Sequence, residues 1–141
     1  MTFAGINYLT VIIAAVVAWL VSAGWYMSLS RVYPAALGKT AEQCQLEMKK
    51  PGAFLPFIYA FVANIIIAWM LAGLLGHLGV GQVTLQNGVV SAAFLWFGFI
   101  LTTLFVNYSF HGRTMRLILI DLGNWLLVLL VMGAIVGGMG V

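Results

Sequence analysis

The fold is decided by residues 51–112, PGAFLPFIYAFVANIIIAWMLAGLLGHLGVGQVTLQNGVVSAAFLWFGFILTTLFVNYSFHG, which contain no Asp, Glu, Lys or Arg. A helix needs about 20 apolar residues to cross a hydrocarbon core of about 30 Å, so this stretch is long enough for two crossings. Gly79-Val80-Gly81-Gln82 interrupts it and predicts a turn between them. Backbone groups in lipid must be satisfied internally, and the stretch lacks the two-residue alternation of a membrane barrel. We therefore expect both crossings to be helices.

The same apolar pattern extends to both sides of this stretch. Residues 1–30 carry no charge, and Asp121 is the only charged residue after Arg116. We expect the first apolar segment to be a retained span rather than a cleaved signal peptide, because no Lys or Arg precedes it and it is long. The sequence thus predicts an all-α integral membrane four-helix bundle, one domain over residues 1–141. The spans are expected at about residues 6–29, 54–78, 85–109 and 115–138.

The composition excludes several classes of protein. The chain has 141 residues and a mass of 15.3 kDa; 64% of the residues are hydrophobic, 6% are charged, and the mean hydropathy is +1.12. Soluble domains are roughly 45–50% apolar and about one quarter charged, so a soluble enzyme, a disordered chain and a secreted disulfide scaffold are excluded. The net charge of +3 is scattered, which argues against a nucleic-acid partner. Cys44 is the single cysteine, so an intrachain disulfide is impossible.

The positive charges predict the orientation in the membrane. All six lie in or beside the connections after the first and third spans, predicted at residues 30–53 and 110–114. An even number of spans places these connections on one face, which the positive-inside rule makes cytoplasmic, so both termini are expected outside. The first connection is also expected to contain a short helix, because Thr40 and Gln43 fit a capping box. The topology charges are Arg31, Lys39, Lys49, Lys50, Arg113 and Arg116.

Small residues recur at the spacing that lets membrane helices approach closely. They form a row in the first span, a second row in the second span and a third in the fourth span. These rows either close the bundle on itself or, in addition, mediate self-association. The residues are Ala14, Ala18 and Ser22, then Gly73 and Gly76, then Gly133 and Gly137.

Asp121 is the only charged residue expected inside a span, and such a group is costly to insert in a membrane. Asn124 shares its helical face, and Asn107 and Tyr108 end the third span at a similar depth, whereas Asn64 lies nearer the middle of the second. We expect these groups to form one polar intramembrane cluster. Either Asp121 holds the helices together through hydrogen bonds or a loop cation such as Arg31 or Arg113, or it is a proton, cation or headgroup site.

The remaining chemistry-bearing residues do not form a catalytic pattern. No phosphate-binding glycine loop, nucleophile elbow or carboxylate pair is present. His77 and His111 are expected at opposite faces of the membrane and therefore predict no shared metal. Aromatic residues near the span ends, including Trp25 and Tyr26, fit interfacial belts, whereas Trp69, Trp96 and Trp125 are deeper. We expect no enzyme activity and no cofactor.

The chain resembles a known family in several segments. The resemblance rests on Gly5-Ile6-Asn7-Tyr8-Leu9, Gly24-Trp25-Tyr26, Asn107-Tyr108-Ser109-Phe110-His111-Gly112-Arg113-Thr114, Leu119-Ile120-Asp121-Leu122-Gly123-Asn124-Trp125 and Met132-Gly133-Ala134-Ile135. These segments are similar to small bacterial four-helix membrane proteins catalogued as a domain of unknown function. The resemblance implies four spans in a bacterial inner membrane and no established activity. Such proteins often carry Asn at the position of Asp121, which favours a hydrogen-bonding role over one that needs a carboxylate.

Three functional interpretations remain open at this point. The first is a non-enzymatic bundle in membrane lipid that acts by self-association as a homo-oligomer, or as an accessory subunit of a larger membrane complex. The second is a small oligomeric transporter or channel with a polar path around Asp121, Asn124, Asn107 and Asn64. The third is a lipid- or isoprenoid-binding protein, for which the deep Trp residues are the only indication.

Overall fold

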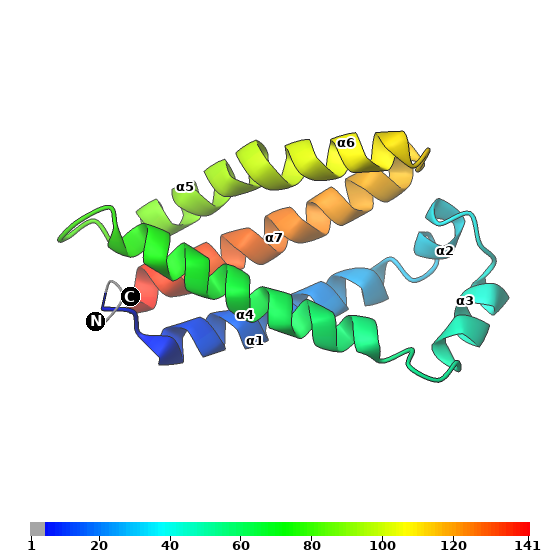
Figure 1. Cartoon of the computed structure of the whole chain (residues 1–141), viewed down its shortest axis with the longest axis horizontal. Helices are drawn as coiled ribbons and strands as arrows, with labels where there is room; N and C mark the ends of the chain where they lie inside the picture. Colours follow the sequence, from blue (N-terminus) through cyan, green and yellow to red (C-terminus); the bar gives the residue numbers. More distant parts are fainter. Residues whose placement is uncertain (1–4) are drawn as a thin grey trace.

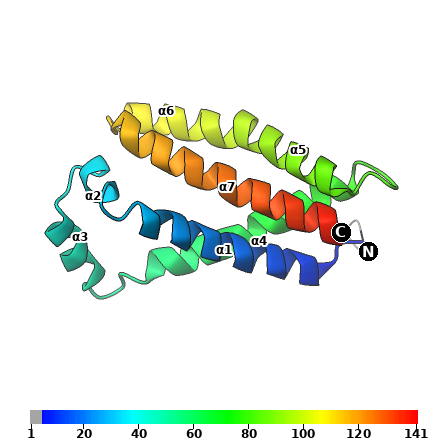
Figure 2. The same ribbon diagram turned by 180° about the vertical axis from the view of Figure 1, so that it is seen from behind.

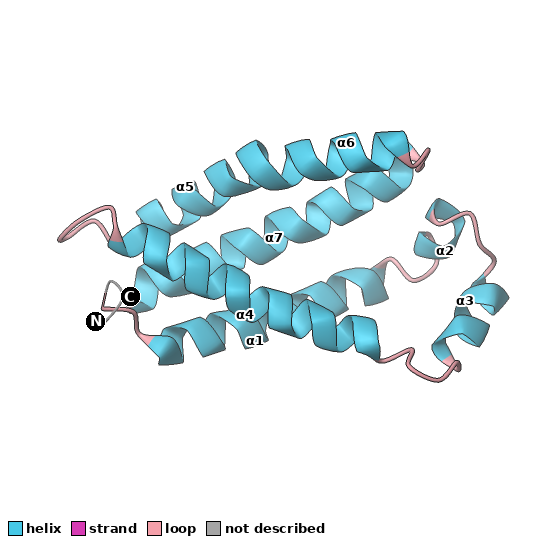
Figure 3. Ribbon diagram, in the orientation of Figure 1, coloured by secondary structure: helices cyan, strands magenta, loops and turns pink. Residues whose placement is uncertain are grey.

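The computed structural model describes residues 5–141, and its regular elements are helices (Figure 3). Four of its helical stretches are long and apolar enough to cross a membrane, which confirms the predicted all-α fold with four spans. The third stretch is continuous but consists of three elements, α5, η1 and α6. The bounds are α1 Tyr8–Ser28, α4 Leu55–Gly76, α5 Leu85–Leu95, η1 Trp96–Leu101, α6 Thr102–Phe110 and α7 Met115–Met139.

Three of the long helices begin at a side chain that accepts a hydrogen bond from the first turn. Asn7 Oδ1 accepts from the amide of Leu9 at 3.1 Å and begins α1. Thr84 begins α5 and Thr114 begins α7 in the same way. Such caps satisfy amides that have no partner inside the helix, which explains why the helices start at these residues.

Helix α7 is the centre of the bundle. It runs between α1 on one side and the third span on the other, while α4 packs across α1 (Figures 1 and 2). The core between them contains Ala14, Ala18, Leu71, Met132 and Val136, which are almost fully buried. In the most apolar 18-residue segment of each span, the buried share of residues is largest in α7, at 44%, and smallest in the third span, at 6%.

The rows of small residues lie largely inside this bundle. Ala14 and Ala18 are fully buried on α1, Gly73 is buried on α4, and Gly76 is half-buried. Gly133 and Gly137 of α7 face Gly88 and Thr84 of α5, where a Cβ added at Gly133 would lie 2.8 Å from Ala92 Cβ. Ser22, the last member of the first row, faces α7. The row on α7 therefore packs against the start of the third span, and a role of the other rows in packing or self-association stays a prediction.

The third span differs from the uniform helix that the sequence predicted. Residues Trp96–Leu101 form a π-helix, whose wider turn accommodates one extra residue. The hydroxyl of Thr102 follows it and donates to the Gly98 carbonyl at 2.8 Å. The irregular turn begins at Trp96, whose indole reaches across to α7.

The connection between α1 and α4 contains two short helices, α2 (Tyr33–Ala36) and α3 (Ala41–Met48). The predicted capping box is confirmed: Thr40 Oγ1 accepts from the Gln43 amide, and Gln43 Oε1 accepts from the Thr40 amide. Helices α2 and α3 and the turn between α6 and α7 lie at the same end of the bundle, which we call the basic end (Figure 1). The start of α1 and the end of α7 lie at the opposite end. That the basic end faces the cytoplasm stays a prediction.

Candidate functional site

The carboxylate of Asp121 joins three helices near the basic end. The residue is 6% exposed on α7. Its Oδ1 accepts a hydrogen bond from the Tyr26 hydroxyl of α1 at 2.6 Å, and its Oδ2 accepts one from the Tyr108 hydroxyl of α6 at 2.9 Å. Each oxygen of the Asp121 side chain therefore has its own phenol donor, one from α1 and one from α6.

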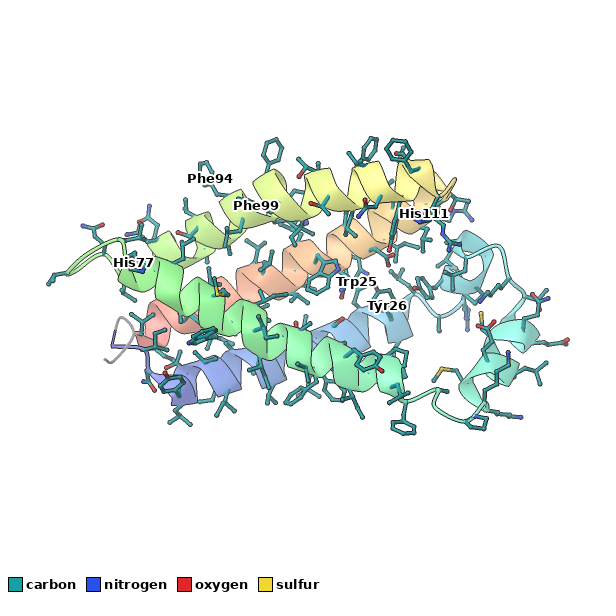
Figure 4. The ribbon with its side chains drawn as sticks, viewed as in Figure 1. Trp25, Tyr26, His77, Phe94, Phe99 and His111 are labelled. Carbon is teal, nitrogen blue, oxygen red and sulfur yellow. The ribbon has the colours of Figure 1, made fainter. Side chains whose placement is uncertain are left out.

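Further hydrogen bonds continue along α7 beside this carboxylate. Ser22 Oγ donates to Asn124 Oδ1 at 2.9 Å, and the Trp25 indole donates to the Ile120 carbonyl at 3.1 Å. Figure 4 shows Trp25 and Tyr26 extending from α1 toward α7. From the third span, the Trp96 indole donates to the Leu122 carbonyl at 2.9 Å. We call this set the polar seam: Ser22, Trp25, Tyr26, Trp96, Tyr108, Asp121 and Asn124.

A glycine of α7 makes room for one of the aromatic rings of the seam. A Cβ added at Gly123 would lie 2.8 Å from Cζ2 and 3.1 Å from Cη2 of Trp25. The ring is held in this place by its indole hydrogen bond to Ile120. Gly123 therefore allows α1 to approach α7 closely at the level of the carboxylate.

The structure brings together three of the five residues of the predicted cluster. Asp121, Tyr108 and Asn124 belong to the seam, whereas the side chain of Asn107 is exposed. Tyr108 is the residue that α6 turns toward α7, and Asn107 beside it points about 100° away around the helix. Asn64 is 3% exposed in α4, and its Oδ1 has no hydrogen-bond partner among the residues that the structure describes. Within the described part of the chain, neither Asn107 nor Asn64 forms a hydrogen bond with Asp121, and their membership of one cluster stays a prediction.

The expected ionic partners of Asp121 are replaced by phenols. In the described part of the chain, no Lys or Arg lies within ion-pairing distance of Asp121, and the ion pair found there joins Lys39 to Glu47 at 2.8 Å. Sequence reasoning had assigned Trp25 and Tyr26 to an interfacial belt, so it missed their contacts with α7. The signal that could have found them is the antiparallel course of the first and fourth spans, which brings the end of α1, with Trp25 and Tyr26, beside the start of α7.

Two groups near the seam but outside the spans have shifted pKa values. Burial raises the pKa of Tyr33 on α2 to about 12, and its ring contacts that of Tyr26 edge to face at 5.0 Å. The hydrogen bond from Lys39 holds the pKa of Glu47 on α3 below its usual value. Tyr33 therefore stays a neutral hydroxyl at ordinary pH, and Glu47 stays a carboxylate.

The two histidines are at opposite ends of the bundle. Figure 4 places His77 beyond α4 and His111 beside the turn between α6 and α7. His111 Nδ1 lies 2.6 Å from the carbonyl oxygen of Asn107. Within residues 5–141, no group of three His, Cys, Asp or Glu side chains is placed to hold a metal ion. The arrangement that the seam does offer is a carboxylate whose two oxygens are both occupied by donors on neighbouring helices.

Comparison with known proteins gives one match. A family model described as "Protein of unknown function (DUF1761)" matches residues 9–137, which include all four long helices except their outermost residues. No curated protein and no solved structure matches the chain.

Proposed function

The chain belongs to the DUF1761 family of unknown function, and we propose that it is a non-catalytic bacterial inner-membrane bundle that acts by association through its third span. The observation that carries this proposal is the exposure of that span. Only 6% of its most apolar 18-residue segment is buried, whereas the corresponding segments of the first, second and fourth spans are 28%, 33% and 44% buried. The third span therefore contributes most of its surface to whatever surrounds the bundle.

The exposed surface of the third span is rich in phenylalanine. Phe94, Phe97 and Phe99 are each at least two-thirds exposed, and Figure 4 shows Phe94 on the outer side of α5. The second span and the third diverge toward the basic end (Figure 1). Between them lies an apolar groove of about 590 Å³, floored by Leu129 of α7. Association in lipid relies on close packing, and a groove beside projecting rings provides complementary surfaces for it.

Two polar residues on the same span favour a protein over lipid as the neighbour. Thr103 and Asn107 lie four residues apart and are exposed, and their side chains form no hydrogen bond within the described part of the chain. A polar side chain at membrane depth gains from a partner on another helix. An amide both donates and accepts, so the Asn107 side chains of two copies related by a twofold axis complement each other. We therefore commit to a second copy of this chain as the neighbour.

Native mass spectrometry of the protein released from lipid nanodiscs tests this proposal. We expect a species at a whole multiple of 15.3 kDa. Replacing Asn107 with Ala should weaken association about three- to thirtyfold, because interhelical polar contacts in membranes contribute about 0.6–2 kcal/mol. The control is Val62→Ala, which alters an exposed residue of α4 and should change nothing.

Two results would overturn the proposal. One is a monomer at every protein-to-lipid ratio; the other is equal weakening by Asn107→Ala and Val62→Ala. Co-purification of larger foreign chains would replace self-association with the role of an accessory subunit.

A transporter or channel is the second candidate, and one observation favours it. Asn64 places an unpaired amide oxygen in the middle of the second span. The hydrogen-bonded state of Asp121 and Asn124 weighs against this candidate, because occupied groups offer no free site for an ion.

A further inference from the structure

A cavity of about 730 Å³ lies between α1, α4 and the α2–α3 connection at the basic end. Its volume falls within the range of roughly 300–1,000 Å³ that is usual for small-molecule sites. Its walls are mostly apolar and include Ala23 and Met27 of α1 and Phe57 and Ala60 of α4. It is separate from the exposed face of the third span, so an occupant here is independent of the association proposed above.

The cavity reaches from the level of the loops deep into the membrane-spanning part. Trp19 lines its inner end, nine residues before the last residue of α1, which is about 14 Å at the helical rise of 1.5 Å per residue. Its outer end is lined by Cys44, Glu47 and Met48 of α3. An occupant of the whole cavity is therefore apolar at one end and polar at the other.

The polar seam forms part of the inner wall. Ser22 and Tyr26 line the cavity and are also the residues of α1 whose hydroxyls donate to Asn124 and Asp121. The seam thus fixes the position of this wall. Tyr33 of α2 lines the cavity beside Tyr26, and the two rings are in edge-to-face contact.

The connection that lines the outer end carries a net positive charge. The connection between α1 and α4 carries four cations against two carboxylates. Lys39 is paired with Glu47, whereas Arg31, Lys49 and Lys50 form no ion pair within residues 5–141. Arg31 follows Ser30 and Lys49 follows Met48, and both preceding residues line the cavity. The charged residue among those that line the cavity is Glu47, which is paired with Lys39. The unpaired cations of the same connection are therefore the groups that complement a phosphate at the end of an apolar chain.

We propose that this cavity binds a membrane lipid with a phosphate head group, its chain lying between α1 and α4 and its phosphate at the outer end, toward the α1–α4 connection. A phosphoglyceride and an isoprenoid phosphate share this chemistry. The apolar parts of these two lipids differ, so measuring the binding of each one separately distinguishes them.

The test is native mass spectrometry of the full chain, titrated separately with phosphatidylglycerol, a polyprenyl phosphate and phosphatidylcholine. We expect a one-to-one adduct with at least one of the two anionic lipids, at least tenfold more populated than the phosphatidylcholine adduct. Ala60→Phe fills the cavity and should reduce that adduct at least tenfold. Val62→Phe puts the same ring on the exposed surface of the same helix, outside the cavity, and should leave the adduct unchanged.

Further variants keep the proposal falsifiable. If Ala60→Phe does not fold, Ala23→Phe fills the cavity from α1 instead. Replacing Arg31, Lys49 and Lys50 together with Gln should remove the preference for anionic lipids. Equal binding of phosphatidylcholine, or an adduct that survives both cavity-filling variants, would overturn the proposal. The oligomer mass is read from the same spectra, so failure of self-association and failure of lipid binding are told apart.

Discussion

The contact between α5 and α7 requires that Gly88 has no side chain, and this makes Gly88→Ala the most informative perturbation of the fold. A Cβ at Gly88 would fall on the carbonyl oxygen of Gly133 and lie 2.9 Å from its carbonyl carbon and 3.0 Å from Gly137 Cα. All three are backbone atoms, so the two helices must separate. Overpacking usually costs about 1–3 kcal/mol, and alanine recovers up to about 1 kcal/mol in helix propensity. Because the overlap is with backbone, which no side-chain rotation can relieve, we take the upper end of the overpacking cost and expect a net loss of about 2 kcal/mol in the free energy of unfolding.

Equilibrium unfolding in mixed micelles, followed by tryptophan fluorescence, measures this loss. Gly24→Ala in α1 is the matched control, because a Cβ there meets nothing within 4 Å. The control should leave stability unchanged or raise it by up to about 1 kcal/mol. Equal unfolding free energies for Gly88→Ala and Gly24→Ala would refute the close approach of α5 and α7.

Two further perturbations test the seam and the connection. Asp121→Asn keeps one acceptor oxygen and offers an amide to the second phenol, so the free energy of unfolding should fall by less than about 1 kcal/mol. Asp121→Leu leaves two hydroxyls without an acceptor and should cost about 1–3 kcal/mol for each. Equal losses for the two variants in equilibrium unfolding would contradict this explanation. The pKa of Glu47 is lowered by Lys39, so the stabilisation from this pair is present above the pKa of the unfolded state and is lost as the pH falls through the folded value. The fluorescence of an environment-sensitive dye attached to Cys44 should therefore change at acidic pH in the wild type and stay constant in Glu47→Gln.

The four spans could be predicted because one energetic term dominates them. Long uncharged stretches have no favourable place outside a membrane, and backbone hydrogen bonding then requires helices. The π-helical turn at Trp96–Leu101 could not be predicted, because it depends on how the third span meets α7 rather than on hydropathy. The low burial of this span could not be predicted either, because lipid-facing and buried faces of a membrane helix are both apolar.

The candidate site was predictable in part. Asp121 stood out because a charged group in a span is costly, and Asn124 followed from helical spacing. Tyr26 was missed because an aromatic residue near the end of a span fits an interfacial belt equally well. Gly88 was missed because it is a single glycine in its helix, and only its position opposite Gly133 shows its importance.

Asn64 distinguishes the association proposal from transport. Its side chain is 3% exposed, and its Oδ1 lacks a partner in the described part of the chain. Leaving a buried polar group unpaired costs about 1–3 kcal/mol, so Asn64→Leu, which is similar in size, should keep or raise the free energy of unfolding. Asn124→Leu is the control, because it removes the acceptor of the Ser22 hydroxyl and should destabilise the bundle.

The two readings of Asn64 differ in what the stable variant does in a membrane. If the amide serves no path, Asn64→Leu keeps the same oligomer mass, and proteoliposomes containing it show the same proton flux as those with the wild type. If the amide belongs to a path for protons or ions, the variant stays folded but loses pH-dependent flux. That loss would refute the association proposal as the whole function, because the seam at Asp121 and Asn124 would still be intact.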